Sequence, residues 1–235
     1  MKKRIEQILN LLYPRCCPLC HKIVKDQQAL ICPECQKKLR PITQPRCMSC
    51  GRPVKEEEEY CRSCRGKERA FFQGRGIFPY DDRMKASIIR YKYDGRRQYG
   101  DFYARAMCVY AGEDIKRWKP DLILAIPLHP RKQRMRGFNQ AWYLAERIGA
   151  YFGIPAQEEG LKKIKDTKSQ KKMSGAMRRR NLTDAFAVSA QVEGKVILLI
   201  DDVYTTGNTI EAAAKCLKEA GAKAVCFLTL CIGAD

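Results

Sequence analysis

The chain has 235 residues, and its 45 Lys and Arg residues outnumber its 26 Asp and Glu residues, which gives a formal net charge of +19. This length suits one core domain with a small additional module, and the positive charge favours phosphorylated or polyanionic ligands. No segment approaches the roughly twenty consecutive apolar residues that a membrane-spanning helix requires, so we expect no membrane span.

The first twelve residues suggest a short amphipathic helix rather than a secretion signal. Their basic start resembles that of a signal peptide, but Glu6, Gln7 and Asn10 interrupt any apolar segment behind it. Four apolar residues instead fall on one helical face: Ile5, Ile8, Leu9 and Leu12. We therefore expect a soluble, cytoplasmic protein whose thirteen cysteines are reduced.

Eight of these cysteines form four Cys-x-x-Cys pairs within one short segment. The pairs are Cys17/Cys20, Cys32/Cys35, Cys47/Cys50 and Cys61/Cys64. Each pair presents two thiolates from one tight turn, and two pairs complete a tetrahedral zinc site. We therefore expect two structural zinc sites, each contributing on the order of 10–16 kcal/mol of apparent binding energy. That contribution matters because residues 14–70 contain few apolar side chains.

The sequence leaves the combination of these pairs open, because sequential and interleaved arrangements both fit. Disulfides fit less well, and so does an iron–sulfur cluster, whose ligands usually lie closer together in the chain. Cys16 and His21 adjoin the pairs and could replace a ligand, although we expect both to be bystanders. The remaining cysteines lie among apolar residues and are expected to be buried: Cys108, Cys216, Cys226 and Cys231.

From Phe71 onward, strand patterns alternate with helix patterns, which predicts a parallel sheet with crossover helices. The predicted strands are 76–80, 122–126, 185–188, 196–200 and 224–231, and the predicted helices are 82–93, 98–118, 141–152 and 210–220. We thus predict an α/β domain, a parallel sheet flanked by helices, over residues 71–235. An N-terminal helix and the double zinc module occupy residues 1–70.

Two predicted loops carry excess positive charge. The first follows strand 122–126 and contains His129 with the basic residues Arg131, Lys132, Arg134 and Arg136. The second, residues 162–181, has nine basic residues, one acidic residue and little periodicity. A long polar loop inside a compact domain is usually a lid or a binding segment, so we expect it to be mobile without ligand. A merely solvated basic surface is the alternative for either loop.

The segment from Val196 to Thr209 is the most informative one in the chain. An apolar strand is followed by Asp201 and Asp202, at the edge where open α/β sheets bind ligands. The next residues, Thr205-Thr206-Gly207-Asn208-Thr209, turn into a helix whose first N–H groups can bind phosphate. An ordinary capped turn is the alternative, but capping needs only one polar residue. No dinucleotide-binding glycine motif or P-loop is present.

This ordered set resembles the signature of type I phosphoribosyltransferases, which bind phosphoribosyl pyrophosphate (PRPP). The resemblance implies that Asp201 and Asp202 bind the ribose hydroxyls and act as the catalytic carboxylates. It assigns the 5′-phosphate to five residues: Thr205, Thr206, Gly207, Asn208 and Thr209. It also places pyrophosphate against the two basic loops, with the candidate ligands Arg134, Arg136, Lys165, Gln170 and Arg178.

Together with the cysteine pairs, the chain resembles the ComF family of competence-associated phosphoribosyltransferase-like proteins. Further motifs carry this resemblance: Tyr91-Lys92-Tyr93-Asp94-Gly95, Ile126-Pro127-Leu128, Arg136-Gly137-Phe138-Asn139-Gln140-Ala141, Asp166-Thr167 with Gln170, and Arg178-Arg179-Arg180-Asn181 before Ala185-Phe186. Residues 165–174 are unusually rich in lysine for this family, which leaves their ligand contacts open. The family implies a role in natural transformation, in which single-stranded DNA enters the cytoplasm, and a partner helicase of the same system.

Two functions fit these motifs. The first is transfer of ribose 5-phosphate from PRPP to an acceptor, with Mg²⁺ neutralising the pyrophosphate; no acceptor signature is visible, so turnover stays an open question. The second is non-enzymatic handling of single-stranded DNA, in which the basic loops follow the backbone and Phe138, Tyr91 or Tyr93 stacks on bases. A zinc-dependent transcription factor is disfavoured, because the cysteine pairs lack a finger-type recognition helix.

Overall fold

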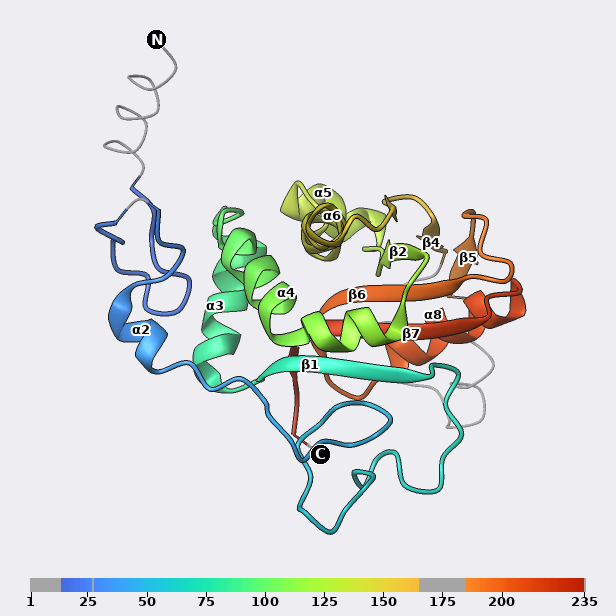
Figure 1. Cartoon of the computed structure of the whole chain (residues 1–235). Coiled ribbons are helices and arrows are strands. Elements are labelled where there is room, and N and C mark those ends of the chain that lie inside the picture. Colours follow the sequence, from blue (N-terminus) through green and yellow to red (C-terminus); the bar gives the residue numbers. More distant parts are fainter. Residues whose placement is uncertain (1–13, 27, 165–184, 235) are drawn as a thin grey trace, which may run out of the picture.

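Five strands form one sheet in the computed structural model of this chain, which describes residues 14–26, 28–164 and 185–234 (Figure 1). The strand order is β1-β7-β6-β2-β3, and all neighbouring strands are parallel. Their bounds are β1 (Gln73–Pro79), β2 (Leu122–Ala125), β3 (Ala156–Gln157), β6 (Val196–Tyr204) and β7 (Ala224–Ile232). The predicted α/β class is therefore confirmed.

Helices cover both faces of this sheet. One face carries α3 (Asp82–Tyr93), α4 (Tyr99–Trp118) and α6 (Gln140–Phe152), and the other carries α8 (Asn208–Glu219). Along β6, Leu198 and Ile200 join the core of the first face, whereas Ile197 and Leu199 join the core that contains α8. Successive strand residues point to opposite faces, so burial on both faces explains the unbroken apolar run.

Local capping signals account for the ends of the helices beside the site. The Asp81 side chain accepts a hydrogen bond of 2.8 Å from the Met84 amide at the start of α3. Asn139 caps α6 in the same way, by accepting from the Ala141 amide at 3.0 Å. Gly153 ends α6 at φ 69°, a left-handed conformation that glycine adopts without steric cost.

Three features differ from the sequence expectation. The first basic loop contains a short helix, α5 (Pro130–Arg136), which ends at Gly137. Strand β6 continues through the two aspartates to Tyr204, because its pairing with β7 extends to Ile232. The predicted strand 185–188 lies outside the main sheet: β5 (Phe186–Val188) pairs antiparallel with β4 (Leu161–Lys163). Strands β3 and β4, of two and three residues, were not predicted, because neither is long enough to show an alternating pattern.

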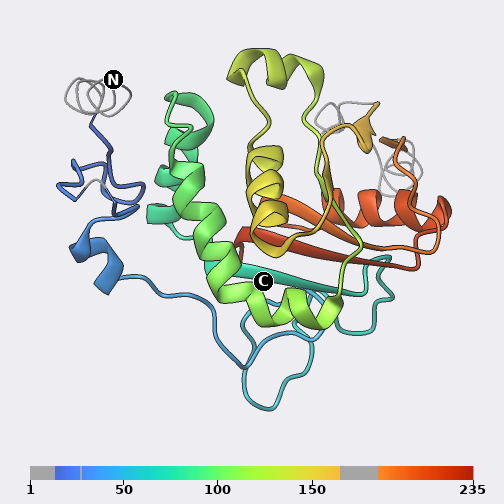
Figure 2. The ribbon, with the colours of Figure 1, turned by 45° about the horizontal axis from the view of Figure 1, so that its top comes forward.

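The cysteine segment packs against the sheet domain as two ribbons. The first ribbon, residues 14–26 and 28–39 with the short helix α2 (Pro33–Lys37), lies outside α3, and the second ribbon, residues 42–69, lies below β1 (Figures 1 and 2). Leu19 of the first ribbon joins the core beneath α3 and α4, while Ile42 of the second joins the core that contains α8. Each ribbon therefore completes its core with side chains of the sheet domain.

Two sequence expectations fall partly outside the described residues. The predicted N-terminal helix lies there, and so do Lys165, Gln170 and Arg178 of the second basic loop. Within the described ranges, no helix is both long enough and apolar enough to cross a membrane.

Candidate functional site

A cavity of about 360 Å³ lies where β2 and β6 end at the carboxyl edge of the sheet. Its walls come from the end of α3, the chain after β2, the start of α6, strand β4 and the turn after β6. The α5–α6 segment stands above this edge of the sheet, across from α3 (Figure 2). Five elements far apart in the sequence thus converge on one polar site.

Asp201 and Asp202 both line this cavity. Asp202 is buried, and its Oδ2 atom lies 2.7 Å from the Nζ atom of Lys92, which comes from the last turn of α3. Asp201 is half-buried, and its Oδ1 atom accepts a hydrogen bond of 2.8 Å from the Asp202 amide. One carboxylate is therefore paired with a cation, while the other is held by the backbone.

These contacts give the two aspartates different surroundings. Burial, followed by the negative charge of Asp202, raises the pKa of Asp201 to about 7, against a smaller opposing effect of Lys92. Burial lowers the pKa of Lys92, but the carboxylates of Asp202 and Asp201 outweigh burial and leave that pKa above its ordinary value. Lys92 is thus protonated at neutral pH, and Asp201 keeps its proton to a higher pH than an ordinary aspartate does.

The turn after β6, residues 205–209, is shaped by Gly207. This glycine is the N-cap of α8 and has φ 81°. A Cβ atom there would also overlap the ring and hydroxyl of Tyr204, so both the backbone and the packing require glycine. Because Gly207 has no side chain to accept from the first amides of α8, these amides are available to an anion. Thr205 and Thr209 face the cavity beside them.

Of the two arginines proposed from the first basic loop, the structure places only one in the lining of the cavity. Arg136 lines the cavity and donates to the Gln140 side chain at 2.7 Å and to the Tyr93 hydroxyl at 2.6 Å. Arg134, on the same short helix, is exposed and lies outside the lining of this cavity. A helix turns about 100° per residue, so residues two apart face different directions. The sequence predicted only a loop here, so it did not distinguish Arg134 from Arg136.

Three residues of this site had not been selected from the sequence: Lys92, Asn139 and Lys163. Asn139 caps α6, and its side-chain amide also donates to the Ile126 carbonyl at 3.2 Å, which ties α6 to the end of β2. A residue of the cap type before an apolar helix could have identified Asn139. Lys92 lies in the motif Tyr91-Lys92-Tyr93-Asp94-Gly95 and Lys163 in the basic loop 162–181, but no local signal places either residue beside the aspartates.

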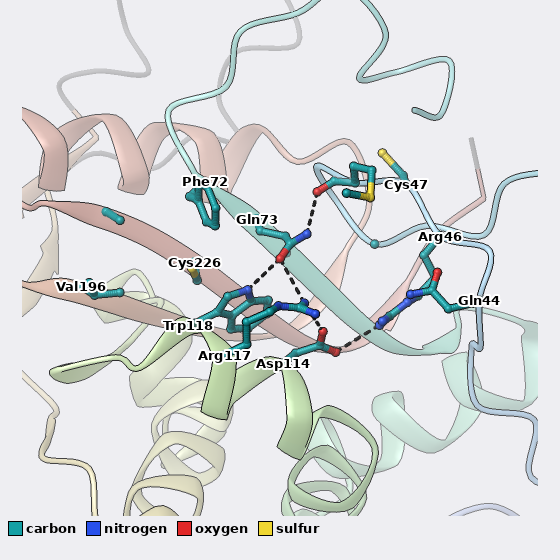
Figure 3. Close-up of a pocket in the computed structure, with 14 residues that line it drawn as sticks. Gln44, Arg46, Cys47, Phe72, Gln73, Asp114, Arg117, Trp118, Val196 and Cys226 are labelled. Carbon is teal, nitrogen blue, oxygen red and sulfur yellow. Dashed lines mark hydrogen bonds and ion pairs between the residues drawn. The ribbon is translucent and has the colours of Figure 1, made fainter. Parts of the chain in front are cut away.

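A second cavity, about 600 Å³ in volume, lies at the opposite, amino edge of the sheet (Figure 3). Its polar groups are engaged with one another: the Gln73 side-chain oxygen accepts from Trp118 at 2.8 Å and from Arg117 at 3.3 Å. Asp114 accepts from Arg117 at 2.6 Å and from Arg46 at 3.1 Å. Despite its larger volume, this cavity lacks the carboxylate pair and the glycine turn.

The eight paired cysteines form two clusters, and they combine sequentially. Cys17, Cys20, Cys32 and Cys35 form the first, and Cys47, Cys50, Cys61 and Cys64 form the second; within each, the sulfur atoms lie within 4.8 Å of one another. The Cys20–Cys32 and Cys50–Cys61 sulfur distances are 3.7 and 3.6 Å. A tetrahedral zinc ion with bonds of about 2.3 Å requires sulfur separations of about 3.8 Å. Both clusters therefore fit zinc.

The two candidate ligands that adjoin the cysteine pairs, Cys16 and His21, make other contacts, as expected. His21 Nδ1 shares a hydrogen bond of 2.5 Å with the Tyr99 hydroxyl, and the Cys16 thiol points to the Pro14 carbonyl. Of the four isolated cysteines, Cys108, Cys226 and Cys231 are buried as predicted, whereas Cys216 is only half-buried.

The sequence of this chain matches two family models and several known proteins. The family model of the double zinc ribbon domain matches residues 8–65, and that of the phosphoribosyl transferase domain matches residues 113–235. The competence protein ComFC of Streptococcus pneumoniae is 32% identical over 206 residues, covering 86% of this chain and 88% of that protein. ComFC of Bacillus subtilis is 32% identical over 202 residues, covering 81% and 79%.

The DNA utilization protein YhgH of Escherichia coli is 27% identical over 224 residues, which cover 94% of this chain and 98% of that protein. These relatives extend across both the cysteine ribbons and the sheet domain, so the similarity is not confined to one module. The expected family is confirmed: the chain belongs to the ComF family, with a double zinc ribbon in front of its phosphoribosyltransferase domain.

Proposed function

We propose that the protein binds PRPP in the cavity at the carboxyl edge of the sheet, and that it acts in the uptake or use of DNA in the cytoplasm. The supporting observation is that the carboxylate pair and the glycine turn line one cavity, together with Lys92 and Arg136. A ribose with free hydroxyls, a 5′-phosphate and a pyrophosphate requires these three kinds of partner: carboxylates, helix-end amides and cations.

In this proposal each part of PRPP meets one part of the site. Asp201 and Asp202 accept hydrogen bonds from the ribose 2′ and 3′ hydroxyls, and the turn 205–209 binds the 5′-phosphate. Arg136 binds pyrophosphate, and the further candidate ligands of pyrophosphate are Arg134 of the first basic loop and Lys165, Gln170 and Arg178 of the second. Mg²⁺ bound with PRPP would neutralise the leaving pyrophosphate, and carboxylate oxygens are ligands of the type it prefers.

Transfer to an acceptor is the finer part of this proposal. As the bond between C1 and pyrophosphate breaks, positive charge develops on the ribose, and the two aspartates stabilise that charge while they hold the ring. Arg136 would hold the departing pyrophosphate through the second N–H group of each terminal nitrogen, Nη1 and Nη2. We propose residues 71–235 as the transferase domain and residues 1–70 as its zinc-stabilised extension.

A second candidate function is handling of single-stranded DNA, with PRPP absent or regulatory and with a helicase as a partner. It is favoured by the names of the relatives, which describe competence and DNA utilization, and by the net charge of +19. Among the aromatic candidates for base stacking, Tyr91 is fully buried and is unsuitable. Tyr93 is 54% exposed with Arg136 over its ring at 4.8 Å, so it is the better candidate.

Calorimetric titration of PRPP with Mg²⁺ tests the proposed function. We expect micromolar binding to the native protein and loss of binding in Asp201→Asn/Asp202→Asn. Asp82→Asn, an exposed carboxylate at the start of α3, is the matched control and should bind as the native protein does. Absence of binding by the native protein would overturn the proposal and leave DNA handling as the function to test.

A pyrophosphate-release assay with bases, amines and ammonia as acceptors then tests transfer separately. Release that depends on an acceptor and is lost in the Asp201→Asn/Asp202→Asn variant would support an enzyme. Binding without any such release would support a regulatory role for PRPP.

A further inference from the structure

The second ribbon reaches the turn 205–209 through Arg52, which is only 3% exposed and lies two residues after Cys50. Its Nε atom donates to the Gly233 carbonyl at 2.8 Å, and its Nη2 atom donates to the Thr205 carbonyl. The guanidinium also lies 5.3 Å from the centre of the Tyr204 ring. One buried side chain of the ribbon thus holds the first residue of the turn.

Arg52 is itself fixed by the cysteine cluster. Its carbonyl accepts a hydrogen bond of 2.7 Å from the amide of Cys47, which closes a turn that contains both cysteines of that pair. The loop lies close to the sheet, because a Cβ atom on Gly51 would overlap the Gly74 carbonyl of β1. The metal-binding turn, the backbone of Arg52 and strand β1 therefore form one packed unit.

Tyr204 connects Arg52 to the glycine turn. Its ring stacks on Phe227 of β7, with 4.8 Å between ring centres and an interplanar angle of 3°, and its other side meets the Arg52 guanidinium. Its hydroxyl occupies the space beside Gly207. Arg52 therefore contacts both the backbone that begins the turn and the side chain that packs beneath its glycine.

The far end of the ribbon holds the other side of the turn. Glu211, in the first turn of α8, accepts a hydrogen bond of 2.9 Å from the Ala70 amide and lies 3.8 Å from the Arg69 guanidinium. Arg69 also points toward the Cys64 sulfur at 3.8 Å. The second cluster is thus connected to residues on either side of the turn, whereas the first ribbon contacts α3, through Ser87 and Arg90.

We propose that Arg52 is a positioning residue through which the second zinc ribbon sets the conformation of the turn 205–209. Through this turn, Arg52 then controls the affinity of the site for a 5′-phosphate, a ligand that itself rests on the proposed function. A guanidinium suits this role, because it can donate to two diverging carbonyls at once and keeps its charge when buried. Its charge also attracts a phosphate bound on the other side of the turn.

Three variants test the proposal in the full chain: Arg52→Met, Arg52→Lys and the control Arg75→Met. Arg75 is equally buried and also joins the second ribbon to the sheet, by donating to the Ile42 carbonyl, but it lies away from the turn. Zinc content should stay at two ions per chain in all three variants. This measurement separates an effect on the turn from loss of the cluster.

The first readout needs no ligand. Hydrogen–deuterium exchange should be faster at the amides of residues 205–210 in Arg52→Met, intermediate in Arg52→Lys, which restores one hydrogen bond, and unchanged there in Arg75→Met. The second readout is PRPP affinity by calorimetry, which we expect to weaken about tenfold or more in Arg52→Met, since hydrogen bonds from charged groups have about that effect.

The two readouts distinguish failure of the positioning role from failure of the proposed function. Unchanged exchange at residues 205–210 in Arg52→Met would overturn the positioning role, whatever the binding result. Faster exchange with no PRPP binding by the native protein would support the positioning role and overturn the proposed function. Equal effects of Arg52→Met and Arg75→Met on the turn would also overturn the inference, because general loosening of the ribbon would then explain both.

Discussion

Lys92 and Asp202 form an ion pair of 2.7 Å at the centre of the candidate site, and their side chains are only 18% and 10% exposed. The pair joins the last turn of α3 to the end of β6, so it couples the helical layer to the strand that carries both aspartates. A buried carboxylate without a partner is costly. The pair therefore neutralises the buried carboxylate of Asp202 and fixes it beside Asp201.

Replacing Lys92 should destabilise the protein more than removing the whole pair does. Lys92→Met leaves the Asp202 carboxylate buried and unpaired, with an expected loss of about 3 kcal/mol in the free energy of unfolding. Lys92→Met/Asp202→Asn should recover much of this loss, as a double-mutant cycle in urea would measure. Additive losses would show that the two side chains do not interact.

The raised pKa of Asp201 predicts an unusual pH dependence of stability. The folded state keeps this carboxyl protonated up to a pKa of about 7, whereas the unfolded chain releases the proton near 3.8. Between these values the folded state binds more protons, so stability from this group is present at low pH and is lost as pH rises toward 7.

The measurement compares unfolding free energies of the native protein and Asp201→Asn from pH 4 to 8. The difference between the two curves should change over this window in the stated direction and level off above it. A difference that stays constant with pH would contradict the raised pKa.

Gly207→Ala should cost both stability and PRPP affinity. Left-handed backbone at a non-glycine residue costs about 1–2 kcal/mol, and the added methyl group also meets Tyr204. Gly194→Ala is the matched control, because Gly194 has φ 70° but open space around its Cβ position. Thermal unfolding and PRPP titration should show the greater loss of stability in Gly207→Ala and a loss of affinity there alone. Equal stability losses in Gly207→Ala and Gly194→Ala would show that the added methyl group does not clash with Tyr204.

Sequential combination of the cysteine pairs predicts how zinc is lost. Cys17→Ser/Cys32→Ser removes two ligands of one cluster and should leave one zinc ion per chain. Cys17→Ser/Cys47→Ser removes one ligand from each cluster and should weaken both sites. Atomic absorption after mild chelation distinguishes the two patterns, and the reverse result would indicate interleaved pairing.

The features that could be predicted from the sequence are those whose signals are local. The Cys-x-x-Cys spacing identified two four-cysteine sites, because each pair forms a turn of its own. The apolar run 196–200 indicated a strand buried on both faces, and Asp201, Asp202 and Gly207 follow it directly in the chain. Motifs of this kind name their residues without knowledge of the fold, and they also identified the family.

Contacts between distant segments could not be predicted and became known from the folded chain. It brought Lys92 to Asp202 across 110 residues of chain and Arg52 to Thr205 across 153, contacts that no local spacing encodes. It combined the cysteine pairs sequentially and placed Arg136, but not Arg134, in the lining of the cavity. Charge pairing and packing depend on which surfaces the sheet and its helices bring together, whereas turns and strands depend mainly on neighbouring residues.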